Sequence, residues 1–431
     1  MKRRDFVRVL AAAPLIGSVR TLSARPPVRL SAQLLVPMDD TQTNHLKAYG
    51  ITYHAIERSG HCEWLLNYRG GSFLLPDDEP ARRAAALTGV ALEPVSDAAV
   101  AAIKAEIAQQ NMDAIPLERV PRVAIYTPPN APPWDDAVTM ALQYADIPFT
   151  KVWDPEVMAG RMRENFDWLH LHHEDFTGQY SKFFLSYQGA PWLDEMVQRN
   201  QAAARALGMP NVPALKKAVA QRIREYVENG GFLFAMCTAT ETLELALAAH
   251  DVDIAAAYAD GTPMDPDADA QLDWSRAMAC QGAHLVTAPG IPAFSDIDGH
   301  QVNNPGRRQP LGAFELFNFS AKIDPVPAML VQSHRGVIPD FYGVTTSFMR
   351  DTLKPADIIL AEEPGAPWVK YIHGDLGRGT WTYFGGHDPE DPQHQIGDTP
   401  TDLSLHPTSP GYRLILNNVL FPAARKRELK T

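Results

Sequence analysis

Short apolar runs alternate with amphipathic stretches over much of the chain. The apolar runs lie at residues 123–126, 149–153, 167–172 and 232–236, and helical periodicity covers 135–144 and 213–228. Such runs separated by helices are typical of a parallel sheet with helices on both faces. We therefore predict an α/β fold built on a doubly wound, mostly parallel, flavodoxin-like sheet.

The closing part of the chain has a different pattern. Residues 369–373 and 380–384 flank the glycine-containing turn GDLGRG. This arrangement predicts a β-hairpin. The periodicity of residues 412–420 predicts a helix near the end of the chain.

A smaller block precedes these elements. Residues 28–36, 51–56 and 63–68 have the pattern of short strands, and the alanine-rich segments 81–87 and 97–109 have the pattern of helices. We predict a small N-terminal α/β accessory domain over residues 29–118, followed by a larger domain over residues 119–431.

The first 28 residues are predicted to be a targeting signal. The segment KRRDFVR contains an arginine pair followed by an aromatic residue, and an apolar run at 9–19 precedes the small residues Ser23 and Ala24. The run is too short to span a bilayer. This pattern is typical of twin-arginine export. We expect a periplasmic or extracellular protein that has no membrane contact after cleavage.

Charge and cysteine content narrow the classes of partner. The chain of 431 residues has a formal net charge of −12, although its first residues are basic. An acidic body argues against nucleic acid and anionic membranes as partners. We expect the partner to be a small-molecule substrate. The three cysteines are far apart, which excludes a disulfide framework and a zinc ribbon.

Cys237 follows the apolar run GGFLFAM and precedes a helical pattern. A cysteine at a strand-to-helix junction faces the backbone N–H groups of the next helix, which favour the thiolate. The N–H of Thr238 would be placed to stabilise an oxyanion. A small buried cysteine without a chemical role is the alternative, and the spacing alone does not separate the two.

His387 is the candidate base for this nucleophile. It follows two glycines at the end of the predicted strand 380–384, and Asp388 or Glu390 could orient its ring. The order cysteine, histidine, acid fits a catalytic triad. A histidine that only caps the loop through hydrogen bonds is the alternative.

The segment HLHHED places further polar groups at another strand end. His172, His173 and Glu174 offer imidazole and carboxylate ligands that suit a divalent metal such as zinc, iron or manganese. The segment matches no known ligand signature. Histidines that are buried or form hydrogen bonds beside a cleft are the alternative, so no cofactor is certain. His173, Glu174 and Asp175, together with the stacking surface of Trp168, are the predicted binding residues.

Three segments resemble the class I glutamine amidotransferase-like superfamily, notably its ThuA-like and PfpI-like branches. They are NGGFLFAMCTATETLELALAA (229–249), GRGTWTYFGGHDPED (377–391) and GYRLILNNVLFPAA (411–424). The resemblance covers the chain from about residue 121 to its end. It implies a cysteine nucleophile at Cys237 that acts on an amide or a related carbonyl.

The sequence also departs from that superfamily. Its glutaminases have a Gly-x-Gln pattern after the cysteine, where this chain has Thr238-Ala239-Thr240-Glu241, and residues 173–175 replace the expected glycine-rich loop. Two further segments are DWLHLHHEDFTGQY (167–180) and PTDLSLHPTSPGYRLILNNVLFPAA (400–424). With them, the whole chain is similar to exported bacterial proteins labelled "asparagine synthetase B". However, it lacks the N-terminal cysteine and the pyrophosphate loop of true asparagine synthetases, so its motifs do not support asparagine synthesis.

These observations leave three hypotheses. The first is an exported cysteine-dependent hydrolase with Cys237 as nucleophile and His387 as base. The second is a metal-dependent hydrolase built from His172, His173, Glu174 and His387. The third is a non-catalytic module that binds a carbohydrate or a peptide in the same cleft.

Overall fold

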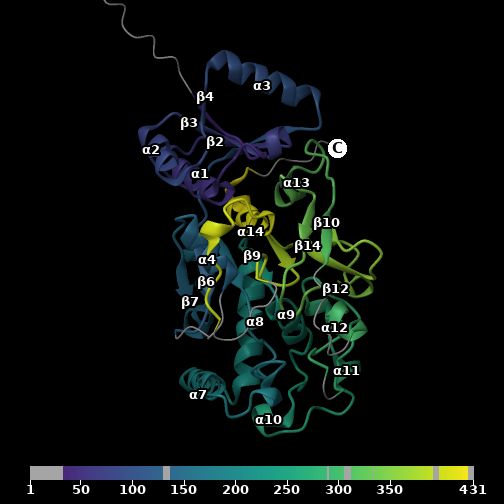
Figure 1. Cartoon of the computed structure of the whole chain (residues 1–431). Coiled ribbons are helices and arrows are strands. Elements are labelled where there is room, and N and C mark those ends of the chain that lie inside the picture. Colours follow the sequence, from purple (N-terminus) through teal and green to yellow (C-terminus); the bar gives the residue numbers. More distant parts are fainter. Residues whose placement is uncertain are drawn as a thin grey trace, which may run out of the picture.

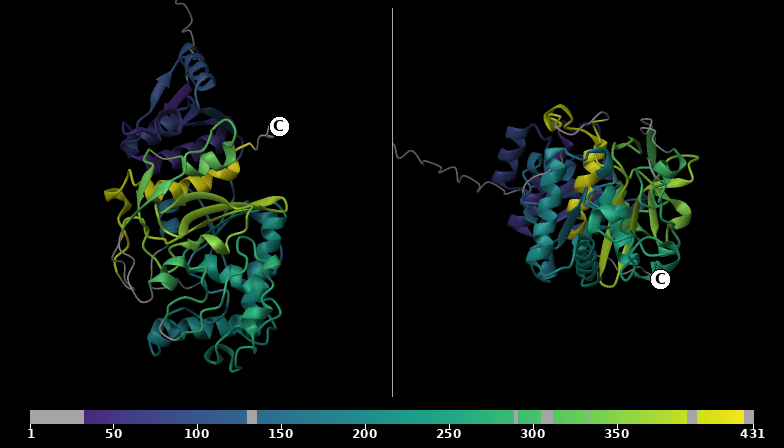
Figure 2. Two further views of the ribbon diagram at one scale, coloured as in Figure 1. Left: turned by 90° about the vertical axis from the view of Figure 1, so that its right-hand side faces the viewer. Right: turned by 90° about the horizontal axis from the view of Figure 1, so that it is seen from below.

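The computed structural model describes residues 33–129, 136–288, 291–304, 312–332, 334–391 and 398–425. The predicted signal at residues 1–28 lies outside this part of the chain. Two sheets and their helices are stacked along the long axis of the molecule (Figures 1 and 2). None of the helices in the described ranges is both long and apolar enough to span a bilayer.

The first sheet has five antiparallel strands in the order β4-β1-β3-β2-β5. Its strands are β1 (Gln33–Val36), β2 (Cys62–Leu66), β3 (Ser72–Pro76), β4 (Glu93–Val95) and β5 (Asp113–Leu117), and its helices are α1 (His45–Ser59), α2 (Glu79–Thr88) and α3 (Asp97–Gln109).

The strand predicted at residues 51–56 was wrong, because these residues lie inside α1. The Asn44 side chain accepts the Lys47 N–H at 2.9 Å, and Gly60 closes the helix in a left-handed conformation. These two caps define a helix whose interior happens to contain β-branched and aromatic residues. Local side-chain preference was overridden by capping and by burial against the sheet.

The second sheet has ten strands, and its main path runs β11-β10-β13-β14-β15-β9-β8-β6-β7. The parallel part comprises β6 (Val123–Tyr126), β7 (Thr150–Val152), β8 (Trp168–Leu171), β9 (Phe232–Met236) and β15 (Gly379–Phe384). The antiparallel part comprises β10 (Ala313–Leu316), β11 (Val337–Pro339), β12 (Phe348–Met349), β13 (Ile358–Glu362) and β14 (Trp368–Leu376).

This mixed sheet agrees with an α/β fold but is less parallel than predicted. Four of its nine pairings in the described residues are parallel and five are antiparallel. The predicted hairpin is present as β14 and β15. The other antiparallel strands are short and lie between proline-rich loops, where periodicity carries little information.

Helices cover both faces of the second sheet. In β9, alternate side chains face opposite sides of the sheet. Phe232, Phe234 and Met236 face one apolar core, whereas Leu233 and Ala235 face the other. The first core also contains residues of α4 (Ala137–Tyr144), α13 (Pro325–Val331) and α14 (Pro410–Leu420), and the second contains residues of α5 (Asp154–Met158), α7 (Pro191–Ala206), α8 (Val212–Glu228) and α9 (Thr238–Ala248). The described residues also form the short α-helices α6 (Met162–Asn165), α10 (Ala257–Asp260), α11 (Ala268–Gln271) and α12 (Gly299–Asn303).

Helix α14 joins the two sheets. The buried guanidinium of Arg413 donates to the backbone oxygen of Met38 at 2.9 Å and to the hydroxyl of Tyr49 at 3.1 Å. Tyr49 in turn donates to Asn417 of the same helix. Because one apolar core contains residues from both sheets, the division into two domains near residue 118 stays a prediction.

Candidate functional site

The candidate site lies where three neighbouring parallel strands end. Strand β9 pairs with β8 on one side and with β15 on the other. The residues that follow these strands are His172 and His173, Cys237, and the loop that carries His387. Parallel pairing therefore brings together groups that are far apart in the sequence, at the edge of the sheet where α/β proteins bind ligands.

Cys237 lies on a sharp turn between β9 and α9. Its φ of 52° is in the left-handed region, which costs a non-glycine residue about 1–3 kcal/mol. Hydrogen bonds hold the turn from both sides. The Cys237 N–H donates to the Phe384 oxygen at 3.3 Å, and the Ala239 N–H donates to the His172 oxygen at 3.1 Å. The elbow is therefore anchored to both neighbouring strand ends.

Two backbone donors lie near the thiol. The Val344 N–H points at the Cys237 Sγ with a nitrogen–sulfur distance of 3.5 Å. The Thr238 N–H, at the start of α9, has no acceptor within the described residues. It joins the positive end of the helix dipole at this position. An oxygen that gains negative charge beside Cys237 would meet that unused donor.

His387 is held beside Cys237 by the neighbouring loop. Its backbone N–H donates to the Tyr342 oxygen at 2.8 Å, and its Nδ1 lies 3.0 Å from Asp388 Oδ1. A side chain on Gly343 would place its Cβ 2.8 Å from the His387 ring, so this approach requires glycine. Glu390, the other predicted orienting acid, pairs with His406 instead, at 3.3 Å.

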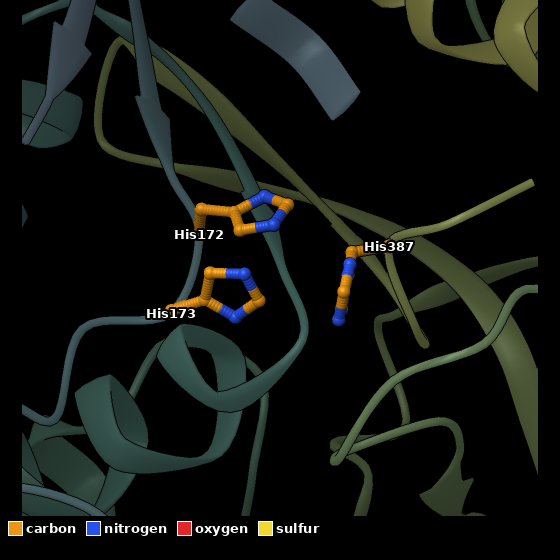
Figure 3. Close-up of side chains that lie close together, drawn as sticks. All are labelled: His172, His173 and His387. Atoms are coloured by element: carbon orange, nitrogen blue, oxygen red, sulfur yellow. The ribbon is translucent and has the colours of Figure 1, made fainter. Parts of the chain in front are cut away.

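Three imidazoles lie close together, and two of them, His173 and His387, contact the Cys237 thiol. The ring centroids of His172 and His173 are 3.9 Å apart, and that of His387 lies 4.9 Å from the first and 4.4 Å from the second. Figure 3 shows the first two rings coming from one chain segment and His387 from another. One nitrogen of each ring lies within 4.8 Å of the others, so these residues could hold a metal ion. Glu174 is not part of this group, and its carboxylate accepts the backbone N–H of His172 at 2.9 Å.

The charges around Cys237 favour its thiolate. Burial alone would raise the pKa of the thiol, but the imidazolium of His387 and hydrogen bonds from His173 and His387 lower it well below its usual value. The pKa of His387 is raised well above its usual value by Asp388 and by Cys237, against the effect of burial. Burial lowers the pKa of His173 to about 3, so this ring is neutral. A thiolate–imidazolium pair results.

A second group of side chains supports His172. Its Nδ1 lies 3.3 Å from His170 Nε2 and 3.6 Å from an Asp136 carboxylate oxygen. Despite its burial, Asp136 has a pKa held below its usual value by His172 and His170. The same carboxylate caps α4 by accepting the Val138 N–H at 2.9 Å. Nothing in the sequence indicated the contact of Asp136 with the two histidines.

A cavity of about 990 Å³ opens beside these groups. Its walls include the predicted site residues His173, Glu174, Asp175, Thr238 and His387. Cys237 itself is fully buried and does not line the cavity. Trp168 does not line it either. Its indole is buried in the core shared with α14, where Nε1 donates to the Asn418 oxygen at 3.0 Å.

A buried ion cluster lies beside the cavity, and the sequence did not predict it. Lys182 contacts both Glu241 and Asp298, and its Nζ lies 2.9 Å from the Thr345 hydroxyl. Glu241 also accepts the Ser295 N–H at 2.7 Å. Its position one turn after Cys237 was visible in the sequence, but a lone glutamate in a helix carries no signal of a buried partner. The cluster fixes Thr345, which is next to the Val344 donor.

Comparisons with known proteins leave the family open. No family model and no curated protein matches this chain. Solved structures that align with it include the cytoplasmic proteins STM3548 of Salmonella typhimurium (TM-score 0.34, 11% identity, 73% of this chain and 91% of that chain) and STM1381 of Salmonella typhimurium LT2 (0.34, 12%, 67% and 86%). A protein of Thermoplasma acidophilum described as a GMP synthase component aligns with a TM-score of 0.33 and 9% identity, over 70% of this chain and 94% of that chain. Alignments at these TM-scores carry no inference about function.

Proposed function

We propose that the protein is a cysteine-dependent hydrolase of the glutamine amidotransferase-like type that acts on an amide or a related carbonyl. The observation that carries this proposal is the contact of the Cys237 thiol with His387, whose other side meets Asp388. Nucleophile, base and orienting acid in this order are the set that acyl transfer needs. The strand order β7-β6-β8-β9-β15 supports a flavodoxin-like arrangement of the parallel part of the sheet.

In the first half of the proposed reaction, the Cys237 thiolate attacks the carbonyl carbon. The carbonyl electron pair moves to the oxygen, where the Thr238 N–H stabilises the negative charge. The intermediate collapses to a thioester as the carbon–nitrogen bond breaks. His387 gives its proton to the departing nitrogen and becomes neutral.

Water completes the reaction. Neutral His387 takes a proton from a water molecule, which attacks the thioester carbon. The carbon–sulfur bond then breaks, a carboxylic acid leaves, and the thiolate and the imidazolium are restored. Because Cys237 is buried behind its neighbours, substrate must displace one of the side chains between the sulfur and the cavity before the first attack. The substrate is a small molecule, and the twin-arginine pattern supports an exported enzyme.

The test is a screen of amide substrates followed by two matched variants. Cys237→Ala should reduce kcat/KM by about a thousandfold or more, the usual effect of removing a nucleophile. Cys280→Ala removes another fully buried thiol and should leave kcat/KM within about twofold of the unmodified protein. Circular dichroism should confirm that both variants fold. Full activity of the Cys237→Ala enzyme on the screened substrate would exclude this mechanism.

A second candidate function is a metal-dependent hydrolase, and the cluster of His172, His173 and His387 favours it. The carboxylate of Asp136 near His172 is the kind of outer partner that orients a metal-binding imidazole. Nitrogen donors with the nearby thiolate would suit zinc, which acts as a Lewis acid toward a carbonyl. Elemental analysis of protein purified without chelators should then find close to one zinc per chain. A content below about a tenth of an equivalent would exclude a tight site.

A further inference from the structure

The cavity beside the candidate site is lined by two lysines and one arginine. Both lysines are neutralised by buried carboxylates. Lys182 contacts Glu241 and Asp298, and Lys216 lies 3.0 Å from both carboxylate oxygens of Asp154. Their charges are therefore already balanced and are not available to a ligand.

Arg199, on α7, differs from these lysines. It has no hydrogen bond or ion pair within the described residues, and its Nε is buried without an acceptor. Burial lowers the pKa of its guanidinium, and the charge of Glu195 on the same helix opposes this effect. A partly dehydrated cation without a counterion costs free energy that an anionic ligand would recover.

Trp153 provides a second, independent donor on the cavity wall. Its side chain is nearly buried, with 8% of the residue exposed, and its indole N–H has no acceptor among the described residues. Buried N–H groups are nearly always bonded in folded proteins. Arg199 and Trp153 thus bring two unused N–H donors to the lining of one cavity, which fits a ligand that carries acceptor oxygens.

We propose that Arg199 binds a carboxylate of the substrate, so that the scissile amide belongs to an acylated amino acid or a similar anionic amide. This proposal rests on the proposed hydrolase function and names its substrate class. The fork of donors on a guanidinium matches a carboxylate. A single unpaired cation fits one negative charge better than a phosphate dianion, because Glu174 and Asp175 also line the cavity.

The apolar part of such a substrate has its own surface. Aromatic side chains form much of the remaining wall, namely Tyr180, Phe183, Tyr187, Trp192, Tyr258 and Phe294. Tyr187 and Trp192 contact each other, with ring centroids 5.4 Å apart. A cavity of about 990 Å³ is larger than a free amino acid needs. An aromatic or long acyl group would fill this space and exclude water from Arg199.

The test compares two probes that differ in one charge. Benzoylglycine and benzoylglycinamide share the amide and the aromatic acyl group, but only the first carries a carboxylate. Isothermal titration on Cys237→Ala protein measures binding without turnover. We expect benzoylglycine to bind about tenfold tighter or more than the neutral probe, as one charge-assisted contact provides. Adding Arg199→Met should abolish this preference, and Arg199→Lys should keep part of it.

Two further variants control the experiment. Arg205→Met removes an exposed arginine from the same helix and should keep the preference. Trp153→Phe deletes the indole N–H and should weaken the binding of benzoylglycine by about a few-fold. This variant also tests the proposal if Arg199→Met does not fold. Equal binding of the two probes, no binding of either, or a preference that survives Arg199→Met would overturn the proposal. Because binding is measured without chemistry, any of these results leaves the hydrolase test independent.

Discussion

Cys237 and Cys280 have nearly the same burial and opposite electrostatic surroundings. They are 0% and 1% exposed, respectively. The imidazoles of His387 and His173 lower the pKa of Cys237, against the effect of burial. Burial and the nearby carboxylates of Glu244 and Asp357 raise the pKa of Cys280 well above its usual value.

The difference shows that burial alone does not decide whether a thiol can act. Glu244 beside Cys280 is fully satisfied, since it accepts the Cys280 N–H at 2.8 Å and the Tyr383 hydroxyl at 2.7 Å. The carboxylate beside Cys280 therefore has its hydrogen-bond partners within the protein. Around Cys237, in contrast, the adjacent charge is the imidazolium of His387, and a donor at Thr238 stays unused. The sign of the adjacent charge separates a reactive thiol from an inert one.

The largest expected effect is a difference in alkylation between the two thiols. In folded protein at pH 7, iodoacetamide should label Cys237 at least about a hundredfold faster than Cys280, because only the former is a thiolate. Cys62 is a second control, since burial raises its pKa to about 11. Peptide mass mapping over time measures all three rates. Equal alkylation rates for Cys237 and Cys280 would show that the two thiols do not differ in reactivity.

Removal of the imidazolium should make Cys237 behave more like Cys280. His387→Gln deletes the positive charge, so the Cys237 pKa should rise and its alkylation at pH 7 should slow by about tenfold or more. In the pH profile, the rise in rate should move to higher pH. His406→Gln, which removes a histidine paired with Glu390, is the control and should leave the profile in place. An unchanged profile for His387→Gln would assign the low pKa to another group.

Glu174, which lies near Cys237, should make the free energy of unfolding depend on pH. Burial raises its pKa from 4.5 to about 7, so between these values the folded state binds more protons than the unfolded state. The free energy of unfolding should therefore fall as the pH rises from about 4.5 to about 7, by about 1–3 kcal/mol. Glu174→Gln should flatten this part of the curve, whereas Glu195→Gln, at an exposed carboxylate, should not. Urea titrations at several pH values measure the slope, and the same slope in Glu174→Gln would refute its assignment.

The smallest expected effect concerns the loop that reaches the thiol. The Thr345 hydroxyl contacts Lys182 and Glu241, whereas the hydroxyl of Thr346 is buried without a partner among the described residues. Thr345→Val should lower the free energy of unfolding by about 1 kcal/mol and raise the Cys237 pKa by less than about one unit, because the Val344 donor shifts. Thr346→Val should change neither quantity. Equal effects of the two variants on the alkylation profile would show that the ion cluster does not position Val344.

The local pattern was sufficient for much of the parallel part of the sheet. The ranges predicted for β6 and β9 agree with the structure, and so does the helix at Asp97–Gln109. Buried strands and amphipathic helices have distinct periods, and glycine and proline mark where they end. The strand-to-helix elbow at Cys237 and the hairpin that leads to His387 follow from the same local signals.

Other features depended on pairings between distant segments. The predicted strand at residues 51–56 is part of α1, and five antiparallel pairings give the sheet a mixed character. Glu390 faces His406, and Trp168 is packed in the core. Short strands carry little periodic signal. The partner of a side chain depends on strand register and on packing, and neither can be read directly from a single sequence.

The chemistry of the candidate site divides in the same way. The sequence by itself determined which residues end the parallel strands, and hence that Cys237, His387 and His173 belong to one edge of the sheet. Only the tertiary structure decided their protonation, because a pKa depends on burial and on charges a few ångströms away. The same is true of the paired Lys182 and the unpaired Arg199. Whether a side chain is charged, and whether its charge is paired, depends on distances between groups that only the folded chain brings together.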